Sequence, residues 1–408
     1  MVIVCAVVIF STTCTLPQVG SSSANNGSDI QSSSSATVQS QSTSPIKNEL
    51  YTYEIPWPPV RLEPYIQSIG QDSVIIAWQT EGESVGEVRY GTSEEVNYRV
   101  QEEVAGRQHA ILLSDLDPDT QYYYQVFSDD VVFSEIVPFH TSMENEESPF
   151  NFVVYGDTQN NHTIHSAIID LALRSNPAFV IHLGDLVDEG NIPQEWIDFF
   201  TTERELLQTI SLFPTYGNHD GEGFFYDSLF FTPGDERWYT FTYANVRFIS
   251  LEVAKDRWPD IEPTSEQYKW LESELSMNDH PWLIVYFHMP PYTSEYGSDA
   301  DRYERTIEET LFIRENLTPL FDKYGVDLVL NGHHHNYQRS HANGITYIVS
   351  GGGGAQISHK LIPDEFLVTY QSIPHLLEIS VDDDHIVIDA ISSYGERIDT
   401  FTLYQKER

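Results

Sequence analysis

The sequence has little positive charge, few sulfur-containing residues and no long apolar run. Among its 408 residues, 21 Lys and Arg stand against 62 Asp and Glu, which gives a formal net charge of −41. A surface this acidic repels nucleic acid and anionic membranes over a Debye length, so we exclude a nucleic-acid polymer as a partner that binds through a basic patch. The same charge favours solubility and concentrates cations near the protein.

Both cysteines, Cys5 and Cys14, lie near the N-terminus, so the rest of the chain has no disulfide and no thiolate metal site. The apolar run Val2–Phe10 is too short to span a bilayer and is typical of a secretory leader, predicted over residues 1–19. A Ser-rich stretch follows and predicts a flexible tether over residues 20–50. These features predict an exported protein, either free outside the cell or held at its surface by a lipid anchor on Cys14. An ordinary cleaved leader is the alternative to the anchor, and no transmembrane segment is predicted.

The first folded unit consists of short segments in which apolar and polar residues alternate. Val74, Ile76 and Trp78 share one face of a predicted strand, and turn residues separate it from the next. This pattern is typical of a β-sandwich, in which a Tyr at the entry of a strand often fixes a corner through its hydroxyl. The predicted limits are a sandwich at 57–142, a polar linker at 143–149 and a catalytic domain at 150–408.

In the second domain, five short apolar runs each end directly before side chains that bind metals. The runs are rich in β-branched or aromatic residues, as buried strands are. Helical spacing of apolar residues between them, for example over Gln267–Leu275 and Thr306–Phe321, indicates alternating strands and helices. In layered α/β folds of this kind, ligands gather beyond the carboxyl ends of the strands. The side chains after the five runs are Asp157, Asp185, Asn218 with His219, His288, and His333 to His335.

These ligand types together fit a pair of first-row metal ions. Carboxylates, an amide oxygen and imidazoles suit divalent or trivalent ions, and one carboxylate can bridge two of them. Two ions held about 3.5–4 Å apart can activate a hydroxide and neutralise both the entering and the leaving oxygen of an in-line displacement at phosphorus. The five runs therefore predict a two-metal phosphoester hydrolase.

With these residues, the chain resembles the calcineurin-like metallophosphoesterases, and the purple acid phosphatases in particular. Pro290, the run Leu320–Tyr324 and the run Tyr337–Ser340 extend the resemblance, which covers residues 57–408. The resemblance implies a fibronectin type III-like β-sandwich followed by a layered αββα catalytic domain. It also implies the roles of the site residues: Asp157 and His335 at the first metal, Asn218, His288 and His333 at the second, Asp185 as the bridge, and His219 as the proton donor to the leaving group.

Two positions depart from the purple acid phosphatases. Asp188 stands where those enzymes carry a metal-binding Tyr, and it is either a ligand or a solvated loop acid. Gln159 stands where related members without the colour carry a metal-binding His. Its amide oxygen is either a further ligand or a local hydrogen-bonding group at a helix entry. Without a phenolate ligand a ferric site is disfavoured, so two divalent or mixed-valence ions of manganese, zinc or iron are expected.

The residues in and after the fifth run allow several interpretations. Arg339 either binds phosphate, because its planar fork suits that group, or forms a surface ion pair. His334 should point away from its two neighbours if the segment is extended. Gly351–Gly354 lacks the Lys-Ser or Lys-Thr of a nucleotide loop and predicts a tight exit from a strand. Three later segments predict antiparallel strands that close a second sheet: Leu376–Ser380, His385–Ala390 and Thr400–Tyr404.

These observations lead to a specific functional prediction. We predict an exported phosphomonoesterase of the acid-phosphatase type, in which a metal-bound hydroxide attacks phosphorus and His219 assists the leaving group. The preference for monoesters follows from the resemblance, and a phosphodiesterase acting on nucleotides or small diesters is the alternative. A protein of another class, a surface-binding protein with a vestigial metal site, is disfavoured because the Tyr is the only expected ligand that differs.

Overall fold

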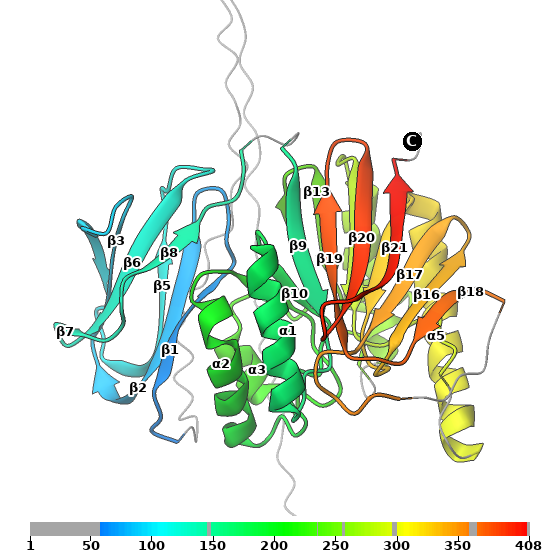
Figure 1. The fold of residues 1–408 in the computed structure, drawn as a ribbon, viewed down its shortest axis with the longest axis horizontal. Helices are drawn as coiled ribbons and strands as arrows, with labels where there is room; N and C mark the ends of the chain where they lie inside the picture. The colour runs from blue at the N-terminus through cyan, green and yellow to red at the C-terminus, as the bar shows by residue number, and fades with distance from the viewer. Residues whose placement is uncertain are drawn as a thin grey trace, which may run out of the picture. The chain divides into compact units, whose positions relative to one another are not determined.

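A computed structural model describes residues 58–405 apart from 145–147, 235, 255–257, 296–299 and 359–364. The predicted leader, the tether and Cys14 lie outside the described residues. Within the described part of the chain, no helix is both long and apolar enough to cross a membrane. The described residues form a β-sandwich followed by an α/β domain (Figure 1).

The sandwich is built from two antiparallel sheets. Its strands are β1 Leu62–Gln67, β2 Val74–Ser84, β3 Gly86–Gly91, β4 Tyr98–Gln101, β5 Gly106–Leu113, β6 Gln121–Ser128, β7 Val131–Val132 and β8 Val137–His140. One sheet has the order β1-β2-β5 and the other β4-β3-β6-β7, with β8 paired to β6. Val74, Ile76 and Trp78 of β2 lie in one buried cluster, which confirms the predicted face. At the start of β6, the Tyr122 hydroxyl accepts a hydrogen bond from the Asp117 amide (2.9 Å), as expected for a sandwich corner.

The α/β domain contains two sheets and their covering helices. The first sheet joins β9 Phe150–Tyr155, β10 Val180–His182, β11 Leu212–Pro214, β19 His375–Val381, β20 His385–Ser392 and β21 Arg397–Tyr404, in the order β11-β10-β9-β19-β20-β21. The second joins β12 Tyr239–Tyr243, β13 Val246–Ser250, β14 Trp282–Phe287, β15 Leu328–Asn331, β16 Tyr337–Ala342, β17 Ile345–Ser350 and β18 Leu367–Gln371, in the order β12-β13-β14-β15-β17-β16-β18. The helices are α1 His162–Ser175, α2 Pro193–Leu207, α3 Phe224–Leu229, the 3-10 helix η1 Trp258–Ile261, α4 Glu266–Ser276 and α5 Ala300–Tyr324.

The two sheets and the helices that cover their outer faces form four layers, because side chains on both faces of the strands are apolar. Val154 of β9 and Ile284 of β14 belong to one buried cluster between the two sheets. Their neighbours point the opposite way, because successive side chains of a strand face opposite sides. Val153 packs with apolar residues of α1 and α2, and Val285 packs with those of α4 and α5. The resulting order of helix, sheet, sheet and helix confirms the predicted αββα arrangement.

The predicted helices form where apolar spacing placed them. The segments Gln267–Leu275 and Thr306–Phe321 lie within α4 and α5, which extend beyond both predicted ends. Helix α1 begins after Asn161, whose side chain accepts a hydrogen bond from the Ile164 amide (3.3 Å). Asn161, and not Gln159, is therefore the residue that caps this helix.

The last three strands form at the predicted places but join a different sheet. β19 pairs antiparallel with β9, and β20 and β21 follow in turn. They complete the sheet that carries Asp157, so the prediction that they close a second sheet was wrong. Apolar alternation identifies the buried side of a strand and says nothing about the edge that the strand joins.

The five runs that end in candidate ligands divide between the two sheets. β9, β10 and β11 are parallel neighbours in the first sheet, and β14 and β15 are parallel neighbours in the second. The carboxyl ends of parallel neighbours lie at the same edge, so each sheet contributes its own set of ligands to the site.

The buried imidazole of His375, at the start of β19, should make the metal-free protein less stable in acid. Burial lowers the pKa of His375 to about 4. Below the usual value of 6.5 the unfolded chain takes up this proton while the folded chain does not, so stability falls as the pH decreases from 6.5 to about 4, by roughly 3 kcal/mol. Urea unfolding of the metal-free proteins at several pH values measures this effect. The free energy of unfolding of His375→Asn should depend less on pH than that of the wild type. Parallel profiles would contradict this assignment.

Candidate metal centre

Three candidate ligands follow their strands in the left-handed backbone conformation. The φ angle is 58° at Asp157, 53° at Asp185 and 69° at His333. This conformation costs a non-glycine residue about 1–3 kcal/mol and persists only where surrounding contacts hold it. One such contact joins the first two strand ends, because the Asp157 amide donates to the Gly184 carbonyl (3.0 Å). Backbone strain of this kind is concentrated at functional sites.

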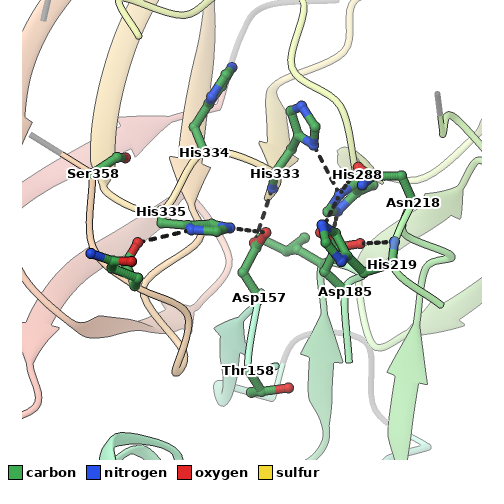
Figure 2. A network of polar contacts seen from close by, with 12 residues as sticks. Asp157, Thr158, Asp185, Asn218, His219, His288, His333, His334, His335 and Ser358 are labelled. Carbon is green, nitrogen blue, oxygen red and sulfur yellow. Dashed lines mark hydrogen bonds and ion pairs between the residues drawn. The ribbon is translucent and has the colours of Figure 1, made fainter. Parts of the chain in front are cut away.

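The candidate ligands form two groups that share Asp185 (Figure 2). Donor atoms of Asp185, His288 and His333 all lie within 4.8 Å of one another, and so do donor atoms of Asp157, Asp185 and His335. Asp185 is thus the carboxylate that the two groups share, and one carboxylate can bridge two ions.

His288 occupies the middle of the first of these groups. Its Nδ1–H donates to the Leu183 carbonyl (2.8 Å), which fixes the ring and turns Nε2 toward the site. His288 Nε2 then lies 3.2 Å from Asp185 Oδ2, 3.1 Å from Asn218 Oδ1 and 3.3 Å from His333 Nδ1. Asn218 therefore joins the residues with which the sequence grouped it.

His335 is oriented in the same manner in the second group. Its Nδ1–H donates to the Gln356 carbonyl (3.0 Å), and its Nε2 lies 3.6 Å from Asp157 Oδ1. The other oxygen of Asp157 accepts a hydrogen bond from the His333 amide (3.0 Å). In both groups a backbone carbonyl selects the histidine nitrogen that faces the carboxylates.

Buried carboxylate oxygens show that this site fits cations. Asp157 and Asp185 are at most 1% exposed. Within the described residues, Asp157 Oδ1 forms no hydrogen bond, and Asp185 Oδ2 faces the ring nitrogen Nε2 of His288 at 3.2 Å. An unpaired anionic oxygen is costly to bury, and a metal ion satisfies it. The carboxylate, imidazole and amide donors match a first-row ion.

In the metal-free protein, bound protons replace part of the positive charge that cations would supply to the site. Burial raises the pKa of Asp157 well above its usual range. Burial opposes protonation of His288, but the neighbouring carboxylates of Asp185 and Asp157 outweigh it and raise the pKa of His288 to about 9. Because cations displace these protons, metal binding should release protons and weaken in acid.

Asp220 supports the site by binding main-chain amides of the ligand loops, and it was not among the residues predicted from the sequence. Its fully buried carboxylate accepts hydrogen bonds from the amides of Asp185 (3.1 Å), Leu186 (2.8 Å) and Gly217 (2.7 Å). In the metal-free protein, burial and the nearby Asp185 raise the pKa of Asp220 to about 7. Two strand ends are joined through this one carboxylate. The available sequence signal was an acidic residue directly after Asn218 and His219.

Gly217 lies where no side chain fits. A Cβ atom on Gly217 would lie 2.1 Å from the Asp185 amide nitrogen. A similar close approach involves the run Gly351–Gly354 after β17. There the Gly353 amide donates to the Gly156 carbonyl (2.8 Å), and a Cβ on Gly351 would lie 2.7 Å from Asp157 Oδ2. The glycine run thus packs on the Asp157 turn, in agreement with the predicted tight strand exit.

His219 lies beside the ligand groups with its ring partly open to solvent. Its amide donates to Asp185 Oδ1 (2.7 Å), and its Nδ1–H donates to the Asp188 carbonyl (2.7 Å). Its side chain is 41% exposed. The Asp188 carboxylate lies 3.6 Å from the same nitrogen and accepts a hydrogen bond from Asn160 (2.7 Å). Asp188 thus contacts the candidate proton donor, and neither ligand group within the described residues includes it.

The structure favours one of the two interpretations of Arg339 but does not choose between those of Gln159. The Gln159 amide donates to the Asp185 carbonyl (3.4 Å), which places the residue beside the site, and its role as a ligand stays a prediction. Two nitrogens of Arg339 bind Asp399 (2.7 and 3.3 Å), and the guanidinium lies over the ring of Phe401. This arrangement favours the ion-pair interpretation of Arg339 over phosphate binding.

The ring of His334 lies edge-on to the ring of His333, with ring centroids 5.0 Å apart, so it does not point away from both neighbours (Figure 2). The prediction assumed an extended segment, whereas His333 has a φ angle of 69°. The Nδ1 atom of His334 lies 3.6 Å from Glu295 Oε2. The same carboxylate oxygen accepts hydrogen bonds from Asn336 Nδ2 and from Ser358 Oγ. His334 therefore belongs to a polar network around Glu295, and its ring takes no part in the two ligand groups of the described residues.

Two segments of the chain match known families. Residues 150–337 match Calcineurin-like phosphoesterase, and residues 59–141 match Purple acid Phosphatase, N-terminal domain. The chain contains a calcineurin-like phosphoesterase domain and a purple acid phosphatase N-terminal domain. The predicted family resemblance and the predicted enzyme class, a metal-dependent phosphatase, are confirmed. The family implies a binuclear metal centre.

Several proteins named as purple acid phosphatases or related phosphatases are similar to this chain. Purple acid phosphatase 18 of Arabidopsis thaliana is 27% identical over 71% of this chain and 69% of its own length. Phosphoenolpyruvate phosphatase of Allium cepa is 29% identical over 71% of this chain and 65% of its own length. A third relative, 26% identical over 74% of this chain and 58% of its own length, is called "Probable inactive purple acid phosphatase 1" of Arabidopsis thaliana.

A solved structure shares the fold of this chain. Purple acid phosphatase PPD1 from seeds of yellow lupin (Lupinus luteus) superposes with a TM-score of 0.73 over 85% of this chain and 74% of its own chain, at 20% identity. The predicted combination of an N-terminal β domain and an α/β metallophosphoesterase domain is thereby confirmed.

Proposed function

We propose that this chain is an exported phosphomonoesterase that works with two metal ions. The observation that carries the proposal is the sharing of Asp185 by two groups of donors, each complete enough to hold one ion. The residues that would hold the ions are Asp157 and His335 for the first, Asn218, His288 and His333 for the second, and Asp185 for both.

The protein's own residues position the reaction. Bound cations supply an activated water and neutralise charge at phosphorus. The hydrogen bond from the His219 amide to Asp185 keeps the imidazole next to the ligand groups (2.7 Å). Because Nδ1–H is bound to the Asp188 carbonyl, Nε2 is the nitrogen that holds the proton for the departing alcohol. A positioned imidazole of this kind typically contributes about 10²–10⁴-fold to the rate as a general acid.

A substrate panel on reloaded protein tests the proposal. The chain is stripped of metal, reloaded separately with manganese, zinc or ferrous iron, and assayed on p-nitrophenyl phosphate and bis(p-nitrophenyl) phosphate in parallel. We expect metal-dependent turnover with a clear preference for the monoester, in line with the relative named phosphoenolpyruvate phosphatase. Faster cleavage of the bis-ester would assign a phosphodiesterase. The absence of turnover with every metal would support the vestigial site.

The iron-loaded protein should lack the purple colour. A purple charge-transfer band requires a phenolate bound to ferric iron, and Asp188 supplies a carboxylate at the position of the missing tyrosine. We expect no strong visible band in protein reconstituted with iron and exposed to air. A purple preparation would contradict the proposed ligand set, and metal analysis of the same sample serves as the control for iron content.

The alternative from a different functional class is a surface-binding protein whose metal centre no longer works. One relative bears the word inactive in its name. The buried carboxylates of Asp157 and Asp185 argue against decay, because two anionic groups buried this close together are costly unless cations bind them.

Export rests on the apolar run Val2–Phe10, which lies outside the described residues. We propose release of the protein or attachment at the cell surface through Cys14. Fractionation of producing cells separates these outcomes: detergent-dependent recovery indicates the lipid anchor, and recovery inside the cell would contradict export.

A further inference from the structure

One loop holds His219 from two sides. The Asp188 carbonyl accepts the Nδ1–H of His219 (2.7 Å), and the Gly190 amide donates to the His219 carbonyl (2.8 Å). The Asp188 carboxylate lies farther from the ring nitrogen, at 3.6 Å. The imidazole is therefore oriented chiefly by a main-chain carbonyl and less by an acidic side chain.

Glu195, in the first turn of α2, holds this loop in turn. Its Oε2 accepts hydrogen bonds from the amides of Asp188 (2.8 Å) and Glu189 (2.7 Å). Hydrogen bonds to an ionised carboxylate are roughly twice as strong as neutral ones. The neighbouring Trp196 adds a third bond, from its Nε1 to the Gly190 carbonyl (2.8 Å).

The Asp188–Glu189 peptide group transmits this contact to His219. A trans peptide is planar, so its N–H and its C=O point in opposite directions. The N–H of this peptide is bound to Glu195, and its C=O is bound to the His219 ring. Glu195 and His219 therefore bind opposite edges of one rigid plane, and the position of the carboxylate determines where the carbonyl meets the imidazole.

We propose that Glu195 is a positioning residue for the proton donor of this enzyme. It acts through the Asp188–Glu189 peptide and sets the direction in which Nε2 of His219 presents its proton. The inference rests on the proposed role of His219 in leaving-group departure. It predicts that loss of the Glu195 carboxylate harms only substrates whose leaving group needs a proton.

The test compares two monoesters on the metal-loaded protein. p-Nitrophenyl phosphate releases an acidic phenol that departs without much help, whereas glycerol phosphate releases an alkyl alcohol that needs protonation. We expect Glu195→Ala to lower kcat on glycerol phosphate by about 10- to 100-fold, with less than about threefold change on p-nitrophenyl phosphate. KM and the bound metal content should stay unchanged.

Further variants separate positioning from general damage. Glu195→Gln keeps an acceptor oxygen and should recover most of the loss, and Glu195→Asp, whose shorter side chain reaches the two amides less well, should show the same substrate selectivity as alanine. Asp188→Ala keeps the main-chain carbonyl and should lose less activity on glycerol phosphate than Glu195→Ala. Glu205→Ala, an exposed acidic residue on the same helix, is the matched control for charge.

The outcomes distinguish this inference from the proposed function. His219→Ala should show the same selectivity, only larger. If His219→Ala discriminates between the two esters and the Glu195 variants do not, the inference is overturned and the proposed function stands. An equal loss on both esters in Glu195→Ala and Glu195→Asp also overturns it, because that pattern reports a general structural role. If His219→Ala does not discriminate, the proton-donor role and the inference fail together.

Discussion

Substitution of Asp185 by Asn should abolish metal-dependent phosphoester hydrolysis and leave the protein folded. Asp185 is the residue that both ligand groups of the described chain share, and its buried Oδ2 lies 3.2 Å from His288 Nε2. Asparagine removes the negative charge and replaces one oxygen by a donor amide, which repels a cation. Loss of several kcal/mol of metal-derived stabilisation corresponds to a fall in kcat/KM on the order of a thousandfold or more.

Metal analysis and a matched variant make this result interpretable. Asp185→Asn should bind less than the full metal complement, while its far-ultraviolet circular dichroism matches the wild type. Asp170→Asn makes the same chemical change at an exposed position of α1 and should keep wild-type activity. Unchanged turnover in Asp185→Asn would refute the two-metal mechanism.

Substitution of Asp220 by Ala should produce the largest loss of stability. The change would leave the buried amides of Asp185, Leu186 and Gly217 without their acceptor. Each orphaned amide costs about 1–3 kcal/mol, so the metal-free variant should lose at least about 3 kcal/mol. Because two strand ends separate when this carboxylate is lost, metal affinity should fall as well, by about 10- to 100-fold as for other groups that orient ligands.

Asp220→Asn serves as the graded control. Its oxygen can still accept from the Asp185 and Gly217 amides, and only the Leu186 amide then faces a donor. The loss of stability should be about 1–3 kcal/mol, between wild type and alanine. Urea unfolding of the metal-free proteins and calorimetric titration with manganese measure the two effects. If Asp220→Ala unfolds at the wild-type urea concentration, the supporting role is disproved.

The candidate ligands were predictable because the residues directly before each of them in the sequence indicate a strand end. An apolar run predicts a strand, and the residue after the run lies at its carboxyl end, as Asp157 and His288 show. The helix positions followed from apolar spacing in the same way, with α4 and α5 extending past the predicted ends. Such features depend on neighbours in the sequence, and composition over a few residues is enough to find them.

The supporting residues were not predictable, because they bind main-chain groups. Asp220 and Glu195 each accept two or more backbone amides, and backbone amides are the same in every residue type. Nothing in the sequence marks which amides a turn will leave exposed. Arg339 illustrates the same limit, since only the structure reveals its partner Asp399, which lies in β21 of the other sheet.

The sequence alone determined the donor types, their order, and the exchange of a tyrosine for Asp188 that removes the basis for a purple colour. The tertiary structure decided that the five strand ends come from two sheets, that the last three strands complete the first of them, and that Asp185 stands in both ligand groups. The physical reason is the distance along the chain over which each feature is determined. Donor chemistry is a property of each side chain, whereas a shared ligand depends on the meeting of strands that lie far apart in the chain.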